Sequence, residues 1–323
     1  MKQSEHIAVF VQCIWGWYAR HKRDLPWRDL AIEDDMERAY HILVSEVMLQ
    51  QTQVSRVKIV FKEFLERFPS IADLAAASNT DVIMAWRGMG YNNRALRLRD
   101  ATREVIKQRY FPVEMSELIR LPGVGHYTAA AIRNFAFNIP TPCLDTNIRR
   151  IIHRSFVGPE NADGTWKRDD RYLLVLTEKL LQDAINPSLS SFHFPLSASN
   201  WHAALMDYGS LVCTMRNPKW DICPLTKAGV MKAAHKEIKR NVERGKREPG
   251  RVVAGKHIPN RIFRGKIVEE LRDAKKGLSV EEIGALVCID WDATQHQEWL
   301  EKLIEALKRD QLIRIHRDKV LLA

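Results

Sequence analysis

Apolar residues recur at helical spacing along nearly all of the chain from residue 5 to residue 230. Few runs in this region alternate between apolar and polar positions, as a half-buried strand would. Prolines and paired glycines interrupt the helical pattern at short intervals, at Pro26, Pro69, Gly88, Gly90, Pro112, Pro122, Pro140 and Pro218. The pattern therefore predicts an all-α body built from many short helices.

Residues 261–323 show a different pattern and predict a small separate unit. Ser279 stands three positions before Glu282, the spacing of a capping box that starts a helix. The chain then ends in two short apolar runs with a charged turn between them. The predicted elements are helices over 261–274, 279–287 and 295–308 and a hairpin over 312–322. These elements indicate a winged-helix-like domain, which would bind DNA or another protein.

A basic segment connects the two regions. Residues 227–266 contain thirteen Lys or Arg and only three Glu, and glycine and proline interrupt them. We predict a flexible basic linker over 233–260. It is either a solvated tether or an arm that contacts phosphates, and the pattern favours neither.

The composition favours a polyanionic partner. Of the 323 residues, 46% are hydrophobic and 28% charged, which excludes a disordered protein. The net charge of +10 favours nucleic acid first and an anionic membrane surface second. No apolar run is long enough to span a bilayer, and the first residues lack the apolar stretch of a signal peptide. We expect an intracellular, cytoplasmic protein associated with the nucleoid.

The stretch Leu121-Pro122-Gly123-Val124-Gly125 carries the most informative local signal. Two glycines two positions apart make a tight turn, and a helical run follows over residues 127–137. Such a turn exposes backbone N–H groups at a helix N-terminus, where the helix dipole favours a phosphate oxygen. Missing side chains also let a backbone approach closely. A bare G-x-G is more often an ordinary helix connection, so the surrounding residues decide.

Those residues resemble a known family. The run 121–132 (LPGVGHYTAAAI) resembles the hairpin of helix-hairpin-helix DNA glycosylases, and 144–150 (LDTNIRR) resembles the segment that carries their catalytic aspartate. The similarity to adenine glycosylases of the MutY type extends from about residue 8 to residue 230. It is carried by the further segments 25–28, 45–54, 88–91 and 204–209. The glutamate-bearing segment 45–54 is the most specific of these.

The resemblance implies a helical two-domain body with a central cleft. Residues 1–28 and 140–232 would form one helical domain, and 29–139 a six-helix barrel-like domain that contains the hairpin. The linker 233–260 and the winged-helix-like domain 261–323 would follow. The implied partner is double-stranded DNA with a mismatch or lesion, bound by a monomer and without a membrane.

Cutting an N-glycosidic bond requires that the base leaves protonated and that the developing positive charge on the sugar is stabilised. By resemblance, Glu46 is the general acid at the adenine and Asp145 is the carboxylate facing the sugar. Asn147, in the same segment, is a further candidate catalytic residue. The apolar neighbours of Glu46 on its helix would raise the pKa of its carboxyl. Alternatively, Glu46 is a structural carboxylate paired with another group, and Asp145 is a helix N-cap. The N-cap role of Asp145 is compatible with a side chain that also faces the pocket.

Tyr127 predicts which chemistry is absent. Bifunctional relatives carry a lysine at this position, which attacks the sugar and forms a Schiff base. Tyrosine forms none, so the resemblance implies a monofunctional enzyme that leaves an abasic site. Adenine-specific and thymine-specific relatives both carry tyrosine here, so Tyr127 does not fix the target base.

Further residues are expected to contact DNA. Gln50 and Tyr91 match family positions that wedge into the duplex where a base has been extruded. The structural alternatives are a surface glutamine and a core or rim aromatic. The remaining candidates are the turn residues Leu121, Gly123, Val124 and Gly125 and the phosphate-contacting arginines Arg28, Arg94 and Arg149. Each of these arginines is alternatively a plain surface residue.

The family often holds a [4Fe–4S] cluster on four cysteines spaced C-x6-C-x2-C-x5-C, and such a cluster needs thiolates at defined spacing. In this chain Cys213 and Cys223 remain, but Trp220 and Gly229 occupy the other two positions. Trp220 would fill the vacated volume with apolar surface. We predict no metal and no cofactor, with all five cysteines as free thiols.

The C-terminal region also departs from MutY-type enzymes, which usually append a Nudix-like domain that reads 8-oxoguanine opposite the adenine. Residues 261–323 are too short and too helical for that domain. The first hypothesis is a monofunctional adenine glycosylase acting opposite G or 8-oxoguanine. The nearest alternative is a thymine or uracil glycosylase acting at T:G or U:G mismatches. A further alternative is a non-catalytic DNA-binding protein, against which the retention of Glu46 and Asp145 argues.

Overall fold

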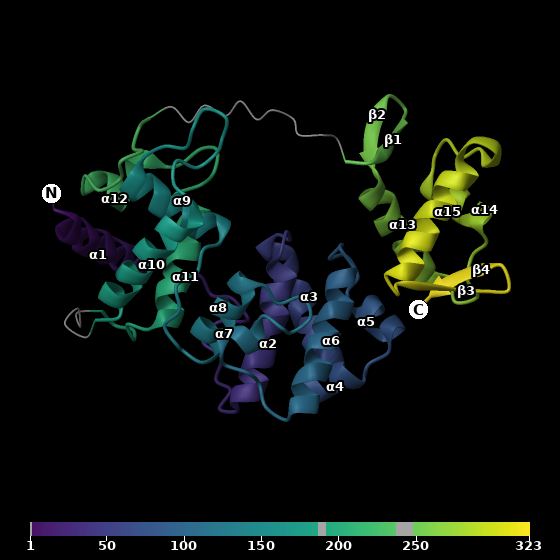
Figure 1. Cartoon of the computed structure of the whole chain (residues 1–323), viewed down its shortest axis with the longest axis horizontal. Helices are drawn as coiled ribbons and strands as arrows, with labels where there is room; N and C mark the ends of the chain where they lie inside the picture. Colours follow the sequence, from purple (N-terminus) through teal and green to yellow (C-terminus); the bar gives the residue numbers. More distant parts are fainter. Residues whose placement is uncertain (1, 187–191, 237–247) are drawn as a thin grey trace. The chain divides into compact units, whose positions relative to one another are not determined.

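A computed structural model of the protein describes residues 2–186, 192–236 and 248–323 (Figure 1). The chain divides into two compact units, which we call the first and the second unit. The first unit comprises Met1–Ile42, Pro112–Arg120 and Val124–Gly245. The second comprises Leu43–Phe111, Leu121–Gly123 and Lys246–Ala323. Helices dominate both units, so the predicted helical class of the body is confirmed.

The first unit is built around α1 (Gln3–His21), which packs against α10 (Asp170–Ala184), α11 (Ala198–Leu211) and α12 (Pro224–Lys227). One face of α1 buries apolar side chains three and four residues apart, as an amphipathic helix requires. The ring centroids of Trp15 and Trp201 lie 5.2 Å apart at the centre of this core. The other elements of this unit are α7 (Met115–Leu118), α8 (His126–Ala136), α9 (Thr146–Ile152), a π-helical turn η1 (His153–Val157) and a 3-10 turn η3 (Trp220–Ile222).

Helix α2 (Asp35–Leu49) begins in the first unit and ends in the second. The first part of the second unit then contains α3 (Val54–Arg67), α4 (Ile71–Ala76), α5 (Asn79–Ala85) and α6 (Asn93–Gln108). Ser70 and Asp73 form a capping box that starts α4, and Ser78 caps α5. Helix α6 packs against α4 and α5. The rings of Phe64 and Trp86 are both buried and contact each other edge to face.

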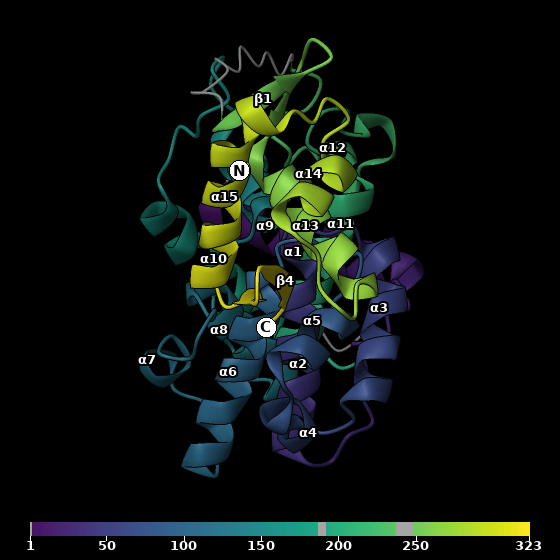
Figure 2. The same cartoon turned by 90° about the vertical axis from the view of Figure 1, so that its right-hand side faces the viewer.

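The predicted winged-helix-like arrangement of the C-terminal residues is confirmed at the level of its elements. Figure 2 shows three helices, α13 (Asn260–Asp273), α14 (Val280–Val287) and α15 (Ala293–Arg309), beside a terminal hairpin. The capping box of Ser279 and Glu282 starts α14 as expected. Strands β3 (Ile313–His316) and β4 (Lys319–Leu322) pair antiparallel, and Leu278 adds a single bridge to Val320.

The predicted linker is wrong at its C-terminal end. Strands β1 (Gly250–Val253) and β2 (Lys256–Pro259) form an antiparallel hairpin directly before α13. Ala254 and Gly255 connect them with φ angles of 48° and 75°, and two positive φ values are what a tight two-residue hairpin turn requires. Charged residues dominate the sequence pattern of this segment, so the pattern did not indicate its short strands. Residues 237–247 of the predicted linker lie outside the described residues.

No helix in the described ranges combines the length and the apolar character that crossing a bilayer requires. The domain boundaries expected from the resemblance stay a prediction.

Candidate active site

Asp145 occupies the N-cap of α9 in the first unit. Its backbone is extended, and its Oδ1 accepts a hydrogen bond of 2.6 Å from the Ile148 N–H. Its Oδ2 accepts one of 3.0 Å from the Asn147 side-chain amide. Burial raises the pKa of the Asp145 carboxyl, while these hydrogen bonds and the charge of Arg150 act in the opposite direction. The carboxylate is thus held in one orientation by groups that favour its ionised form.

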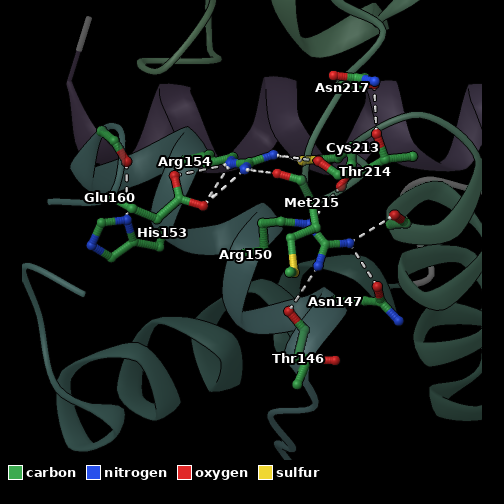
Figure 3. A network of polar contacts seen from close by, with 12 residues as sticks. Thr146, Asn147, Arg150, His153, Arg154, Glu160, Cys213, Thr214, Met215 and Asn217 are labelled. Carbon is green, nitrogen blue, oxygen red and sulfur yellow. Dashed lines mark hydrogen bonds and ion pairs between the residues drawn. The ribbon is translucent and has the colours of Figure 1, made fainter. Parts of the chain in front are cut away.

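A chain of polar contacts leads from Asp145 to the loop that follows α11. Figure 3 shows the part of this chain from Asn147 onward. Asn147 donates to Asp145 and accepts a hydrogen bond of 2.6 Å from Arg150 Nη2. Arg150 also donates to the Gly209 carbonyl at 2.8 Å and to the Cys213 carbonyl at 2.6 Å. A Cβ at Gly209 would lie 2.7 Å from the Cβ of Asn147, so only glycine fits there. Arg150 therefore fixes which way the Asn147 amide faces.

A buried ion pair continues this network. The side chains of Arg154 and Glu160 are both 0% exposed, with 2.8 Å between Nη2 and Oε1. Arg154 also donates to the carbonyls of Thr214 at 2.7 Å and Met215 at 3.1 Å. Figure 3 shows these groups converging on the segment around Cys213. No local sequence pattern predicts this network. Its one signal is Arg150 on α9, where the other buried residues are isoleucines.

The residues at the family's cluster positions do not fit four-thiolate ligation. Cys223 Sγ contacts the Tyr208 hydroxyl at 2.8 Å, and Arg154 Nη1 lies 3.7 Å from Cys213 Sγ. Burial raises the pKa of the Cys213 thiol, which opposes the thiolate that a metal needs. The Arg154 guanidinium carbon lies over the Trp220 ring, 5.9 Å from the ring centroid. In the part of the chain that the structure describes, no group of three or more His, Cys, Asp or Glu side chains could hold a metal ion. No disulfide joins the five cysteines, which all lie within the described residues.

The glycine-rich turn leads into α8 as predicted. Gly125 is its N-cap and has extended backbone, and the Ala129 N–H donates to the Gly125 carbonyl at 2.9 Å. Leu121 and Val124 are buried. Gly123 has a φ of 78°, a conformation that favours glycine. Tyr127 stands half-buried in the first turn of α8.

Glu46 lies near the end of α2 and is 5% exposed, with buried apolar neighbours at Val44, Val47 and Met48. Gln50 follows four residues later, directly after the end of α2 at Leu49. Tyr91 is 48% exposed, and its φ of 46° is uncommon for a bulky residue. Gln50 and Tyr91 line one pocket of the second unit. Glu46 and Asp145 belong to different units, so their convergence stays a prediction.

The predicted phosphate-contacting arginines are all engaged within the protein. Arg28 forms two hydrogen bonds of 2.7 Å to the fully buried Asp207. Arg94 donates to the carbonyls of Val47 at 2.8 Å and Met89 at 3.2 Å, and burial lowers its pKa. Arg149 pairs with Asp170 at the protein surface. These contacts give Arg28 and Arg94 structural roles that local sequence did not indicate, and their contact with phosphate stays a prediction.

Comparisons with known proteins agree with this picture. Residues 44–168 match the family model described as the HhH-GPD superfamily base excision DNA repair protein. The chain is 36% identical over 264 residues to the adenine DNA glycosylase of Mycolicibacterium smegmatis, covering 80% of this chain and 79% of that protein. It is 32% identical over 294 residues to the adenine DNA glycosylase of Mycobacterium tuberculosis H37Rv, covering 90% of this chain and 86% of the relative.

A solved structure of a thermostable thymine-DNA glycosylase superposes with a TM-score of 0.58 at 26% identity, covering 69% of this chain and 95% of that one. The helical fold, the glycine-rich turn before α8 and the capped aspartate define a helix-hairpin-helix protein of base excision DNA repair. Within that superfamily, the chain belongs to the family of adenine DNA glycosylases.

Proposed function

We propose that the protein is a monofunctional DNA glycosylase that removes a mismatched adenine opposite G or 8-oxoguanine and leaves an abasic site. The observation that carries the proposal is Asp145, a carboxylate fixed at a helix N-cap within the segment that matches the repair family. The chain around it is 36% identical to a protein named adenine DNA glycosylase.

In the proposed reaction Glu46 donates a proton to the adenine ring while the bond to the sugar breaks. Its burial among apolar side chains suits an acid that keeps its proton until the base accepts it. The ionised Asp145 stabilises the positive charge that develops on the sugar, as a second carboxylate does in glycosidases. Water then adds to the sugar carbon. Asn147 and Arg150 act as positioning residues, because Asn147 bonds to the Asp145 carboxylate and Arg150 bonds to Asn147.

The absence of strand cleavage rests on Tyr127, which stands where bifunctional relatives have a lysine. A phenol forms no Schiff base with the sugar, so the phosphate backbone remains intact until alkali is added. Products resolved with and without alkali should therefore differ, with breaks only after treatment. Breaks without alkali would contradict this assignment.

The test of the function is a panel of duplexes carrying A:8-oxoG, A:G, T:G or U:G, each scored for alkali-labile sites. We expect sites at adenine only. Asp145→Asn should abolish excision while retaining binding to the mismatched duplex, because asparagine also caps a helix. Asp169→Asn is the matched control, since Asp169 caps α10 in the same way. An unchanged excision rate in Asp145→Asn would remove the site assignment.

A second candidate is a thymine or uracil glycosylase acting at T:G or U:G. Two observations favour it: Tyr127, which thymine-specific relatives also carry, and the structural likeness to a thymine-DNA glycosylase. Excision confined to the T:G and U:G duplexes would decide for this candidate. Binding without excision of any duplex would instead indicate a non-catalytic DNA-binding protein.

We further propose that the protein binds duplex DNA as a monomer, at the nucleoid, and without an iron–sulfur cluster. The basic net charge of +10 supports a DNA partner. The contacts of Arg154 with Glu160 and with the Thr214 and Met215 carbonyls support the absence of a cluster. They hold the segment after Cys213 in place through protein groups alone. Iron analysis and the visible absorbance of protein purified without oxygen test it, and stoichiometric iron would overturn it.

A further inference from the structure

The C-terminal residues of the second unit carry their opposite charges on different elements. Residues 280–310, which span α14 and α15, contain eight Asp or Glu and three Lys or Arg. The terminal hairpin 313–322 and the turn 274–279 before α14 instead contain five Lys or Arg and one Asp. These six residues are Lys275, Lys276, Arg314, Arg317, Asp318 and Lys319.

The two basic segments lie side by side. The backbone N–H groups of Leu278 and Val320 donate to each other's carbonyls, at 3.0 and 2.8 Å. A Cβ on Gly277 would lie 2.8 Å from the Val320 carbonyl oxygen, so the turn with the two lysines packs closely against β4. Both lysines are exposed, whereas Lys319 pairs with Glu282 at 2.7 Å. The turn and the hairpin therefore form one basic surface.

The hairpin of β3 and β4 is held at its base. The Asn79 side-chain amide donates to the Gln311 carbonyl at 3.0 Å, and the Thr80 hydroxyl donates to the Ala323 carbonyl. The turn of the hairpin lies at the opposite end of the strands from the C-terminus (Figure 1). Residues 314–318, which include this turn, are exposed. A supported hairpin thus presents its turn to solvent.

The turn itself is made of unfavourable residues. Arg317 and Asp318 connect the strands with φ angles of 46° and 61°. A two-residue turn with two positive φ values favours Asn-Gly, and arginine is uncommon in this conformation. The fold of the hairpin does not require a guanidinium at this position. A conformation that costs free energy at an exposed position indicates that the side chain serves another purpose.

The chemistry of this surface suits duplex DNA. A guanidinium is attracted to a narrow minor groove, and lysines pair with backbone phosphates. In helix-turn-helix proteins the second helix of the pair enters the major groove, and in this unit that helix is α15. Its exposed side chains include Glu298, Glu301 and Glu305, whose charges repel phosphate. The charges therefore favour DNA at the hairpin over DNA at α15.

We propose that the hairpin of β3 and β4 is a DNA contact that does not depend on sequence and acts on the duplex outside the extruded base pair. Arg317 enters the minor groove, Lys275 and Lys276 pair with neighbouring phosphates, and α15 faces away from the DNA. These cations read the backbone, which is the same along the duplex. The inference rests on the proposed function only in taking duplex DNA as the partner.

Arg317→Asn tests the contact without weakening the hairpin. Asparagine suits a positive φ better than arginine does, so thermal unfolding should show a stability equal to or above that of the wild type. Ala254→Asn is the matched control. Ala254 also holds the first position of a two-residue hairpin turn, with a φ of 48°, and its replacement removes no charge.

The measurement is the Kd for an undamaged duplex and for the same duplex with one A:8-oxoG pair, at several salt concentrations. Arg317→Asn should lower the slope of log Kd against log salt by about 1. At about 0.1 M salt its Kd should rise roughly fivefold to tenfold for both duplexes, so that their ratio stays the same. Ala254→Asn should bind as the wild type does. An unchanged slope in Arg317→Asn, or a loss confined to the damaged duplex, would overturn the proposal.

The lysines and α15 give a second, independent measurement. Combining Lys275→Gln with Lys276→Gln should lower the slope by about 2. Arg309→Gln removes an exposed cation at the end of α15 and should leave the slope unchanged. A slope change in Arg309→Gln with none in the lysine variant would place the DNA on α15 and refute the role of the hairpin.

Binding to the undamaged duplex separates this inference from the proposed function, because it needs no excision. A loss of slope in Arg317→Asn supports the hairpin contact even if the wild type excises no adenine. Adenine excision by the wild type, together with wild-type binding by Arg317→Asn, would retain the function and refute the hairpin contact.

Discussion

Replacing Arg154 by methionine removes the cation of the buried pair that holds the segment after Cys213. Methionine keeps most of the apolar stem, so the change isolates the guanidinium. The loss leaves the Glu160 carboxylate, which is 0% exposed, without its counter-ion. It also removes the donors to the Thr214 and Met215 carbonyls, which accept at 2.7 and 3.1 Å.

Breaking a buried pair on one side costs ~3–5 kcal/mol, because an uncompensated charge stays buried. That is a large part of the ~5–15 kcal/mol by which a typical domain is stable. Leaving a buried carbonyl unsatisfied costs a further ~1–3 kcal/mol. Combining Arg154→Met with Glu160→Leu removes the stranded charge but not the stranded carbonyls. The double variant should therefore recover stability relative to Arg154→Met and still lie below the wild type.

Urea unfolding followed by far-UV circular dichroism measures these free energies of unfolding for the two single variants and the double variant. Arg67→Met is the control, because Arg67 pairs with Asp81 at the surface and should change stability by less than ~1 kcal/mol. A loss in Arg154→Met no larger than in Arg67→Met would refute the structural role of the pair. Equal losses in Arg154→Met and the double variant would show that the carbonyls, not the charge, dominate.

Three further predictions concern the site. Gly209→Ala should reduce excision strongly, because its Cβ would meet the Asn147 Cβ at 2.7 Å and turn the amide away from Asp145; single-turnover rates check this, and an unchanged rate would contradict it. The excision rate should rise with pH through a pKa of Asp145 that burial raises, so the acid limb lies above that of an ordinary aspartate. Asn147→Ala removes a hydrogen bond that favours the ionised form, so the midpoint of that limb should move further up in the pH–rate profile, and a downward move would exclude Asp145 as its source.

Local patterns predicted the C-terminal elements well because their signals are local. The capping box at Ser279 and Glu282 lies within four residues, and it starts α14 as expected. The hairpin Gly250–Pro259 was missed because its turn, Ala254-Gly255, lies in a run dominated by charge and glycine. Such a run favours a linker when only composition is considered.

The supporting network of the site could not be read from local sequence. Arg150 bonds to carbonyls 59 and 63 residues away, and no spacing rule connects those positions. The internal partners of Arg28 and Arg94 could not be predicted for the same reason, because a sequence does not reveal which cations find acceptors within their own chain. The N-cap role of Asp145 was predictable, since the helix that follows requires a cap. Its catalytic role stays a prediction.

The N-cap position of Asp145 has an evolutionary consequence. The same carboxylate starts a helix and is proposed to serve the reaction, yet asparagine performs the first task nearly as well as aspartate. A single substitution of Asp145 by asparagine can therefore remove the proposed excision activity without destabilising the fold. Catalytically inactive homologues that still bind damaged DNA can therefore arise from this fold with little loss of stability. Such proteins would cover lesions instead of removing them.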